Sequence, residues 1–174
     1  MSLYPILETE RLVLSAPTAA DIAPMHAIVS DPDTGRFLGL VSNPATQFER
    51  FARNAGSWML YGYGSFMARL HGSEELIGNV GVFHSWRGLG ADFDNNPEAG
   101  WILHRDHAGQ GLAAEAMRAI FAWFDATHGP RRIVCMIGVG NVASMRLAEK
   151  LGFSSMREAV LPDGDRVTLL ERHP

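Results

Sequence analysis

The chain opens with alternating hydrophobic and polar positions and continues with hydrophobic residues at helical spacing. The stretch from Arg11 to Ala16 alternates and is rich in Leu and Val, which predicts a strand that ends before Pro17. Thr18 and Asp21 have the spacing of a capping box, so we expect a helix to begin there. Predicted strands of the first half span residues 11–16, 65–70 and 76–86, and predicted helices span residues 18–29 and 46–61. The turn-forming residues 71–74 make the last two strands an antiparallel hairpin.

Strand and helix patterns alternate in the second half, which finishes with a hairpin pattern around residues 162–165. Predicted strands there span residues 98–103, 132–139, 154–161 and 166–170, and predicted helices span residues 109–128 and 141–151. Residues 87–97 have the Gly, Asp, Asn and Pro content of an exposed loop, which we expect near the substrate. Neither a repeat nor a linker interrupts the sequence. We therefore predict one domain, residues 1–174, of the α/β (α+β) class, with a mixed sheet covered by crossover helices.

Composition narrows the classes of function. The 174 residues carry a formal net charge of -4 without an excess of Lys and Arg, so we expect no nucleic-acid partner. Residues 1–9 lack the pattern of a signal peptide. The longest hydrophobic run, residues 119–124, is far shorter than the ~20 residues of a membrane-spanning helix, so we expect no membrane partner. The single cysteine, Cys135, lies in a hydrophobic strand pattern, and we expect it to be buried in a soluble, cytoplasmic protein.

The first candidate for chemistry is a glycine loop between a predicted strand and a predicted helix. Gly109 and Gly111 would let the backbone approach a ligand, and free amides at the helix start would bind a pyrophosphate. The two glycines are equally well explained as a tight connection between the strand and the helix, without any ligand. Residues 109–114 also satisfy the dinucleotide pattern G-x-G-x-x-A, but residues 138–141 lack the acid that would bind the ribose.

The second candidate is the helix over residues 141–151, which Asn141 caps and Gly152 ends. In order along the chain come a strand, H-A-G-Q-G-L-A-A-E-A, another strand, and then N-x-x-S-x-R-x-x-x-K-L-G-F. This order resembles the cofactor half of the GNAT superfamily of N-acetyltransferases. The opening E-T-E-R-L-V-L, residues 8–14, is similar to that of the ribosomal-protein N-terminal acetyltransferase branch.

The resemblance implies a mostly antiparallel central sheet, flanked by helices and splayed between the strands over residues 98–103 and 132–139. Acetyl-CoA would be wedged into this cofactor cleft as cosubstrate, and no metal is implied. The cofactor-binding residues that it implies are Ile102, Leu103 and His104 by their main chain, Gly109, Gln110, Gly111, Leu112 and Ala113 by their amides, and Asn141, Ser144 and Lys150. This sequence departs from the family at Asp106, where Gln or Arg is common, and at Gln110, where the branch often has a basic residue.

Acetyl transfer requires a deprotonated amine, a stabilised oxyanion and a protonated leaving thiolate. Glu98 begins the cofactor strand and is our first candidate for the base, with His84 second. An amide near Leu103 would stabilise the oxyanion. Family members often use a Tyr as general acid, but the sequence has no Tyr after Tyr63, which leaves Ser144 for an acid or a binding role. His104 and His107 lack a third ligand at a convincing spacing, so we predict no metal site.

We therefore expect transfer of the acetyl group of acetyl-CoA to a primary amine, by direct attack in a ternary complex. The acceptor is either a protein N-terminus or a small-molecule amine. Two other classes of function stay open at this point: a non-catalytic acyl-CoA-binding module and, more remotely, a nicotinamide-dependent oxidoreductase. Both a homodimer and a monomer are compatible with the sequence.

Overall fold

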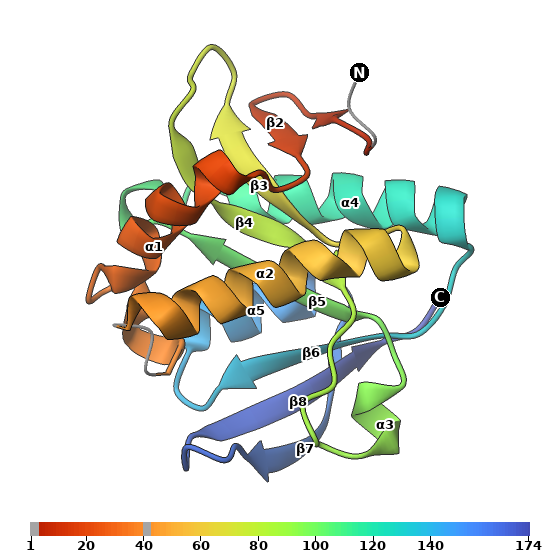
Figure 1. The fold of residues 1–174 in the computed structure, drawn as a ribbon. Coiled ribbons are helices and arrows are strands. Elements are labelled where there is room, and N and C mark those ends of the chain that lie inside the picture. The colour runs from red at the N-terminus through yellow and green to blue at the C-terminus, as the bar shows by residue number, and fades with distance from the viewer. Residues whose placement is uncertain (1–3, 40–42) are drawn as a thin grey trace.

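The computed structural model describes residues 4–39 and 43–174, and it forms one eight-stranded sheet (Figure 1). The strands follow the order β1-β2-β3-β4-β5-β6-β8-β7 across the sheet. Their bounds are β1 Leu7–Glu8, β2 Leu12–Ser15, β3 Ser65–Leu70, β4 Leu76–Phe83, β5 Glu98–Leu103, β6 Ile133–Gly138, β7 Ser154–Val160 and β8 Arg166–Arg172. This agrees with the predicted fold class. Residues 1–3 of the segment without a signal-peptide pattern lie outside the described residues.

Helices cover both faces of the sheet: α1 and α2 lie in front of it in Figure 1, and α4 and α5 lie behind. The α-helices are α1 Ile22–Ser30, α2 Pro44–Tyr61, α3 Ala91–Asp94, α4 Leu112–His128 and α5 Val142–Lys150. Short 3-10 helices span η1 Ala19–Asp21, η2 Gly35–Phe37 and η3 Arg105–His107. The main-chain N–H of Thr18 donates to Asp21 at 2.8 Å, which confirms the predicted capping box.

The sheet changes character between β5 and β6. Its other neighbouring strands pair antiparallel, and β4 and β5 pair at six positions. Strands β5 and β6 are parallel and pair at only two, Glu98 with Val134 and Ala99 with Cys135. Helix α4 provides the crossover between these two strands. The remaining residues of β5 and β6 diverge, so the predicted opening of the sheet is present.

The core lies mainly between the sheet and α4. Residues of α4 at helical spacing are fully or nearly fully buried: Ala116, Met117, Ile120, Phe121 and Phe124. They pack in one cluster with sheet residues such as Phe66 and with residues of α5 such as Ala148. A second cluster joins α1 and α2 to the other face of the sheet. Helices α4 and α5 therefore pack in the first cluster, and α1 and α2 pack on the opposite face of the sheet in the second.

The structure of residues 87–97 differs from the exposed loop that the sequence predicts. It contains the short helix α3, and Phe93 is 1% exposed and packs against Val134 and Leu169. The many Gly, Asp and Asn residues of this segment predicted an exposed loop, and the burial of Phe93 was therefore not predicted. The preceding strand β4 accordingly ends at Phe83 rather than at Trp86. Strand β1, which pairs with β2 through Leu7 and Leu14, was not predicted because two residues carry no periodic pattern.

The thiol of Cys135 is 1% exposed in the middle of β6, as expected. Burial, together with the nearby negative charge of Glu98, raises the pKa of this thiol well above its usual value. We expect Cys135 in the native protein to react with Ellman's reagent at least ~100-fold more slowly than in urea, because the reactive form is the thiolate. Stopped-flow absorbance at both conditions measures this, and fast native labelling would contradict the buried position.

Candidate active site

The start of α4 lies beside the glycine loop. Gly109 and Gly111 have φ angles of 74° and 79°, in the left-handed region that favours glycine. These conformations delay the helix, which begins at Leu112 rather than at Gly109 as predicted. The first helical hydrogen bond runs from the Glu115 N–H to the Gly111 carbonyl, so the amides of the first turn before Glu115 have no acceptor within the helix. Such amides, aided by the helix dipole, form an anion site.

Arg11 contributes a cation to this loop from the other end of the sequence. Its Nη1 donates to the Gln110 carbonyl at 2.9 Å, and its Nη2 lies 2.6 Å from Glu115. Thr9 also donates to Glu115 at 2.6 Å. Burial opposes ionisation of Glu115, but the bonds from Thr9 and Arg11 prevail and lower the pKa of its carboxyl. The sequence prediction missed this tie; its signal was the E-T-E-R-L-V-L opening, which we interpreted as a strand and as a family resemblance but not as a partner of the glycine loop.

The main chain of β5 faces the opening at alternate residues. The His104 N–H donates to the Ile77 carbonyl of the β4 side at 2.8 Å. In an antiparallel ladder the groups of Ile102 then also face β4, whereas those of Trp101 and Leu103 face β6. Of the three residues predicted to pair with the pantetheine arm, only Leu103 therefore presents its main chain to the opening. His104 and Ile102 do not, and Trp101 was missed because sequence alone does not fix which residues form the hydrogen-bonded pairs.

Helix α5 brings two of its predicted residues to the same opening. Asn141 caps the helix, accepting a hydrogen bond from the Ser144 N–H at 3.2 Å. The Ser144 hydroxyl oxygen accepts from Trp101 Nε1 at 3.3 Å, so it links α5 to β5. Lys150 is the last residue of α5, about 9 Å along the helix axis from Ser144. The structure therefore places Lys150 at the far end of α5, away from the other two predicted residues, Asn141 and Ser144.

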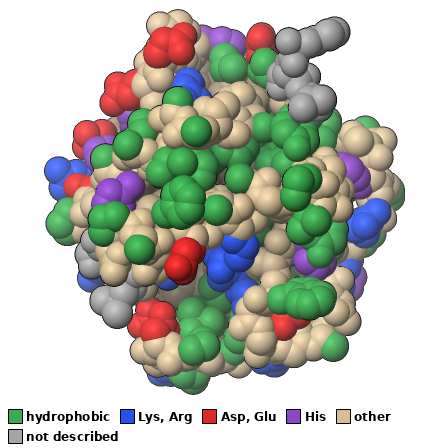
Figure 2. Space-filling view, viewed as in Figure 1, with side chains coloured by type: hydrophobic (Ala, Val, Ile, Leu, Met, Phe, Trp, Pro, Cys, Tyr) green, Lys and Arg blue, Asp and Glu red, His purple; other side chains and the backbone are tan. Residues whose placement is uncertain are grey.

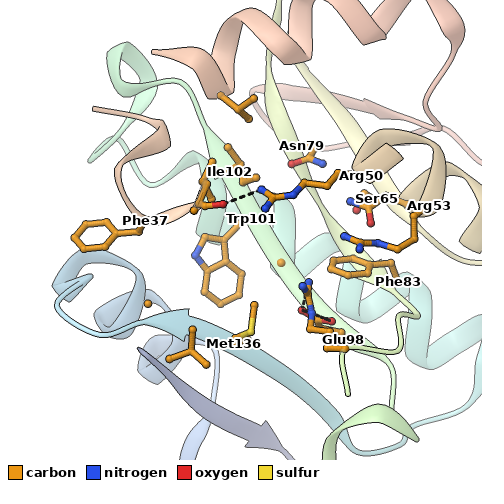
Figure 3. A pocket seen from close by; sticks show the side chains of 18 of the residues that line it. Phe37, Arg50, Arg53, Ser65, Asn79, Phe83, Glu98, Trp101, Ile102 and Met136 are labelled. Carbon is orange, nitrogen blue, oxygen red and sulfur yellow. Dashed lines mark hydrogen bonds and ion pairs between the residues drawn. The ribbon is translucent and has the colours of Figure 1, made fainter. Parts of the chain in front are cut away.

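A pocket of about 660 Å³ lies on the other side of the opening (Figure 3). Its floor includes both diverging strands, with Gly100, Trp101 and Ile102 from β5 and Met136 and Gly138 from β6. Its walls come from the α1–α2 segment, from α2 and from the β7–β8 turn. The wall residues with side chains of interest are Arg36, Arg50, Arg53, Arg87, Asp163, Asp165 and Arg166.

Glu98 lies in this pocket, but its carboxylate is already engaged. The side chain is almost fully buried, and Arg87 binds it through Nε at 2.7 Å from Oε2 and through Nη2 at 2.7 Å from Oε1. Ser85 donates to Oε2 at 2.6 Å. Burial by itself would lower the pKa of Arg87. The attraction and hydrogen bond of Glu98 outweigh this effect, so the pKa of Arg87 is raised. Glu98 and Arg87 therefore form a closed ion pair at the point where β5 and β6 part.

His84 follows Phe83, the residue that pairs with Glu98 between β4 and β5, but unlike Glu98 it does not line the pocket. Its ring stacks on Tyr61 with centroids 4.4 Å apart, and its Nδ1 lies 3.4 Å from the Tyr63 hydroxyl. The two base candidates of the sequence analysis are thus in different surroundings. Within residues 4–39 and 43–174, no three His, Cys, Asp or Glu side chains are grouped to hold a metal ion. None of the helices in this described part has the length and hydrophobicity to span a membrane.

A sheet opened at a parallel strand pair, with free helix amides at one side of the opening and a pocket at the other, is the arrangement expected of an acyl-CoA-dependent acyltransferase. Comparison with known proteins gives the family. The chain belongs to the GNAT acetyltransferases, because residues 11–154 match the model described as an acetyltransferase (GNAT) domain. This membership confirms the resemblance and supports an enzyme rather than a binding module or a nicotinamide-dependent oxidoreductase.

Individual relatives agree with the family. The chain is 28% identical over 169 residues to the uncharacterized N-acetyltransferase YoaA of Bacillus subtilis, covering 91% of this chain and 87% of that protein. A putative GnaT-family acetyltransferase from Bordetella pertussis superposes with a TM-score of 0.86 at 34% identity, covering 97% and 99% of the two chains. RimL, a ribosomal L7/L12 α-N-protein acetyltransferase in complex with coenzyme A, shares the fold at a TM-score of 0.76 and 17% identity, covering 97% and 98%.

The Arg87–Glu98 pair yields a stability prediction. Arg87→Gln leaves the buried Glu98 carboxylate without its cation, so we expect the free energy of unfolding to fall by about 3 kcal/mol. Urea denaturation followed by circular dichroism measures the loss. Arg87→Met combined with Glu98→Leu leaves neither charge unpaired and should recover most of it. An additive loss in the double variant would show that the two side chains act independently.

The start of α4 yields a prediction about cofactor affinity. Ala113→Asp places a carboxylate among the first-turn amides, where it favours the helix dipole but competes with a phosphate. We expect acetyl-CoA affinity, measured by calorimetry, to fall by about 10-fold or more while the melting temperature does not fall. Ala113→Asn has nearly the same shape without the charge and serves as the control. Equal affinities of the two variants would place the phosphates elsewhere.

Proposed function

We propose that the protein transfers the acetyl group of acetyl-CoA to a primary amine by direct attack in a ternary complex. The observation that carries this proposal is the opening between β5 and β6, whose two diverging strands form the floor of the 660 Å³ pocket. The coenzyme A complex of RimL and the name of the YoaA relative support it. A protein N-terminus and a small amine are both acceptors of this class.

Acetyl-CoA is proposed to lie with its pyrophosphate on the amides of residues 109–113, close to Arg11. Its pantetheine arm would run along the outward-facing main chain of Leu103 and Trp101, with Asn141 and Ser144 on the opposite side. The thioester would then reach the pocket floor at the opening. An amide of Trp101 or Leu103 is positioned to donate to the oxyanion that forms when the amine attacks.

The acceptor amine must arrive without its proton. Glu98 lines the pocket, but its two oxygens already accept hydrogen bonds from Arg87 and Ser85 and do not lie free to face a substrate. Nearby guanidinium groups disfavour an ammonium ion and lower the pKa of a bound amine. We propose that the proton leaves to solvent and that Glu98 holds Arg87 in place. Glu98 or His84 as base, and Ser144 as acid, stay predictions.

An assay for released coenzyme A tests the function. With acetyl-CoA and a panel of peptide and small primary amines, we expect Ellman's reagent to report thiol release that depends on the amine, because Cys135 is buried. A thermal-shift titration should show stabilisation by acetyl-CoA and coenzyme A and none by NAD. Stabilisation without amine-dependent release would instead indicate a binding module, and a shift with NAD alone would reject the proposal.

The pH dependence of kcat/KM for Glu98→Gln separates the two roles of Glu98 in the same assay. If Glu98 were the base, the variant would lose the rise of kcat/KM with pH. If Glu98 only holds Arg87, the rise persists at a lower absolute rate. His84→Gln provides the comparison for the second candidate.

A further inference from the structure

The acceptor pocket has a cation without a partner. Arg53 lies on α2, one turn after Arg50, and both guanidinium groups point into the pocket in Figure 3. Much of the Arg53 side chain is exposed to solvent. Among residues 4–39 and 43–174, Arg53 makes neither a hydrogen bond nor an ion pair, whereas Arg50 donates to the Leu38 carbonyl at 2.8 Å.

The other cations of the pocket have partners, and the acids Asp163 and Asp165 lie together with the Arg50 guanidinium around Gly39. Arg87 and Glu98 neutralise each other. Arg166 pairs with Glu158 at 2.6 Å, and Arg36 lies over the ring of Phe37 at 5.4 Å. Burial and then repulsion from Arg87 lower the pKa of Arg50, and attraction to Asp163 of the β7–β8 turn only partly opposes them, so this acid acts on Arg50 and not on Arg53.

The neighbouring charged side chains together produce a positive electrostatic potential at Arg53. Burial, then repulsion from Arg87, lowers the pKa of Arg53, and the opposing attraction of Glu98 comes after the effect of Arg87. Repulsion from Arg50 adds to it. Figure 2 shows Lys or Arg side chains (blue) at the edge of the hollow below α2, with Asp or Glu side chains (red) beside the same hollow. This local excess contrasts with the formal net charge of -4 of the whole chain.

We propose that the amine acceptor carries a carboxylate, and that Arg53 binds this carboxylate while the amine faces the opening between β5 and β6. The inference rests on the proposed acetyl transfer and adds its substrate class. The planar guanidinium can donate two parallel hydrogen bonds to a carboxylate. The coenzyme A phosphates are not the anion concerned, because their proposed site at residues 109–113 does not line this pocket.

Two kinds of acceptor carry both a primary amine and such a carboxylate. Pairs of acceptors that differ only in this charge distinguish them. A small amino acid is represented by β-alanine, with β-alaninamide as its neutral match. An acidic protein N-terminus is represented by Ser-Asp-Ala-amide, with Ser-Asn-Ala-amide as its match. Rates are compared per fraction of free amine, since the two members of a pair differ in amine pKa. We expect the acidic member of one pair to have a kcat/KM about 10- to 100-fold above its match.

Arg53→Gln should remove this preference by raising KM for the acidic acceptor far more than for the neutral acceptor, with the KM for acetyl-CoA nearly unchanged. Arg53→Lys keeps the charge but not the planar fork and should restore part of the preference. Arg118→Gln removes the same charge from an exposed position on α4 outside the pocket and should leave the preference intact. Equal use of acidic and neutral acceptors by the unchanged protein would overturn the inference.

A binding measurement keeps the two proposals separate. With coenzyme A present, calorimetry should detect N-acetyl-β-alanine or N-acetyl-Ser-Asp-Ala-amide and not the neutral match, and Arg53→Gln should abolish the difference. Acetyl transfer without any carboxylate preference, in rates or in binding, would reject the carboxylate site and leave the acetyltransferase intact. Absence of transfer to every amine, with no stabilisation by coenzyme A, would reject the proposed function itself.

Discussion

Main-chain groups of β5 that point away from β4 need partners, and β6 supplies them only as far as Ala99. Beyond this residue, the N–H and C=O groups of Trp101 and Leu103 face an opening instead of a strand in the described part of the chain. Unpaired backbone groups in a protein interior are costly unless water or a ligand satisfies them. An extended cosubstrate with amide groups meets that requirement as a strand would. The rest of the site is arranged around this interrupted ladder.

The two sides of the opening use positive charge differently. At the start of α4, backbone amides and the helix dipole supply the attraction, and the nearby cation Arg11 is neutralised by Glu115. In the pocket, attraction comes from side chains, with Arg87 bound to Glu98 and Arg53 left unpaired among the described residues. An acidic protein can therefore present a local cationic site to its acceptor. The ion pair at Glu98 lies where the parallel strands still pair, so it ties the segment between β4 and α3 to β5 beside the point where β5 and β6 diverge.

Much of the fold could be predicted from the sequence because its strands and helices carry strong periodic patterns. Strand β5 and helix α5 lie within a residue of their predicted bounds. The glycine loop and Asn141 were likewise predictable, because φ preferences and capping are local properties. The pocket was not, because Arg50, Arg53 and Arg87 come from segments whose packing depends on the whole sheet. Whether a main-chain group faces β4 or β6 also depends on strand register, which hydrophobic alternation at Ile102 and Leu103 does not specify.

The tie of Thr9 and Arg11 to Glu115 connects positions 106 and 104 residues apart in sequence. It fixes the edge of the sheet to the first turn of the helix on which the cosubstrate phosphates are proposed to rest. A change of Arg11 alone would leave a carboxylate beside those phosphates, and a change of Glu115 alone would release a cation toward them. Arg11 and Glu115 are therefore expected to vary together among relatives, because their charges act as one electrostatic unit.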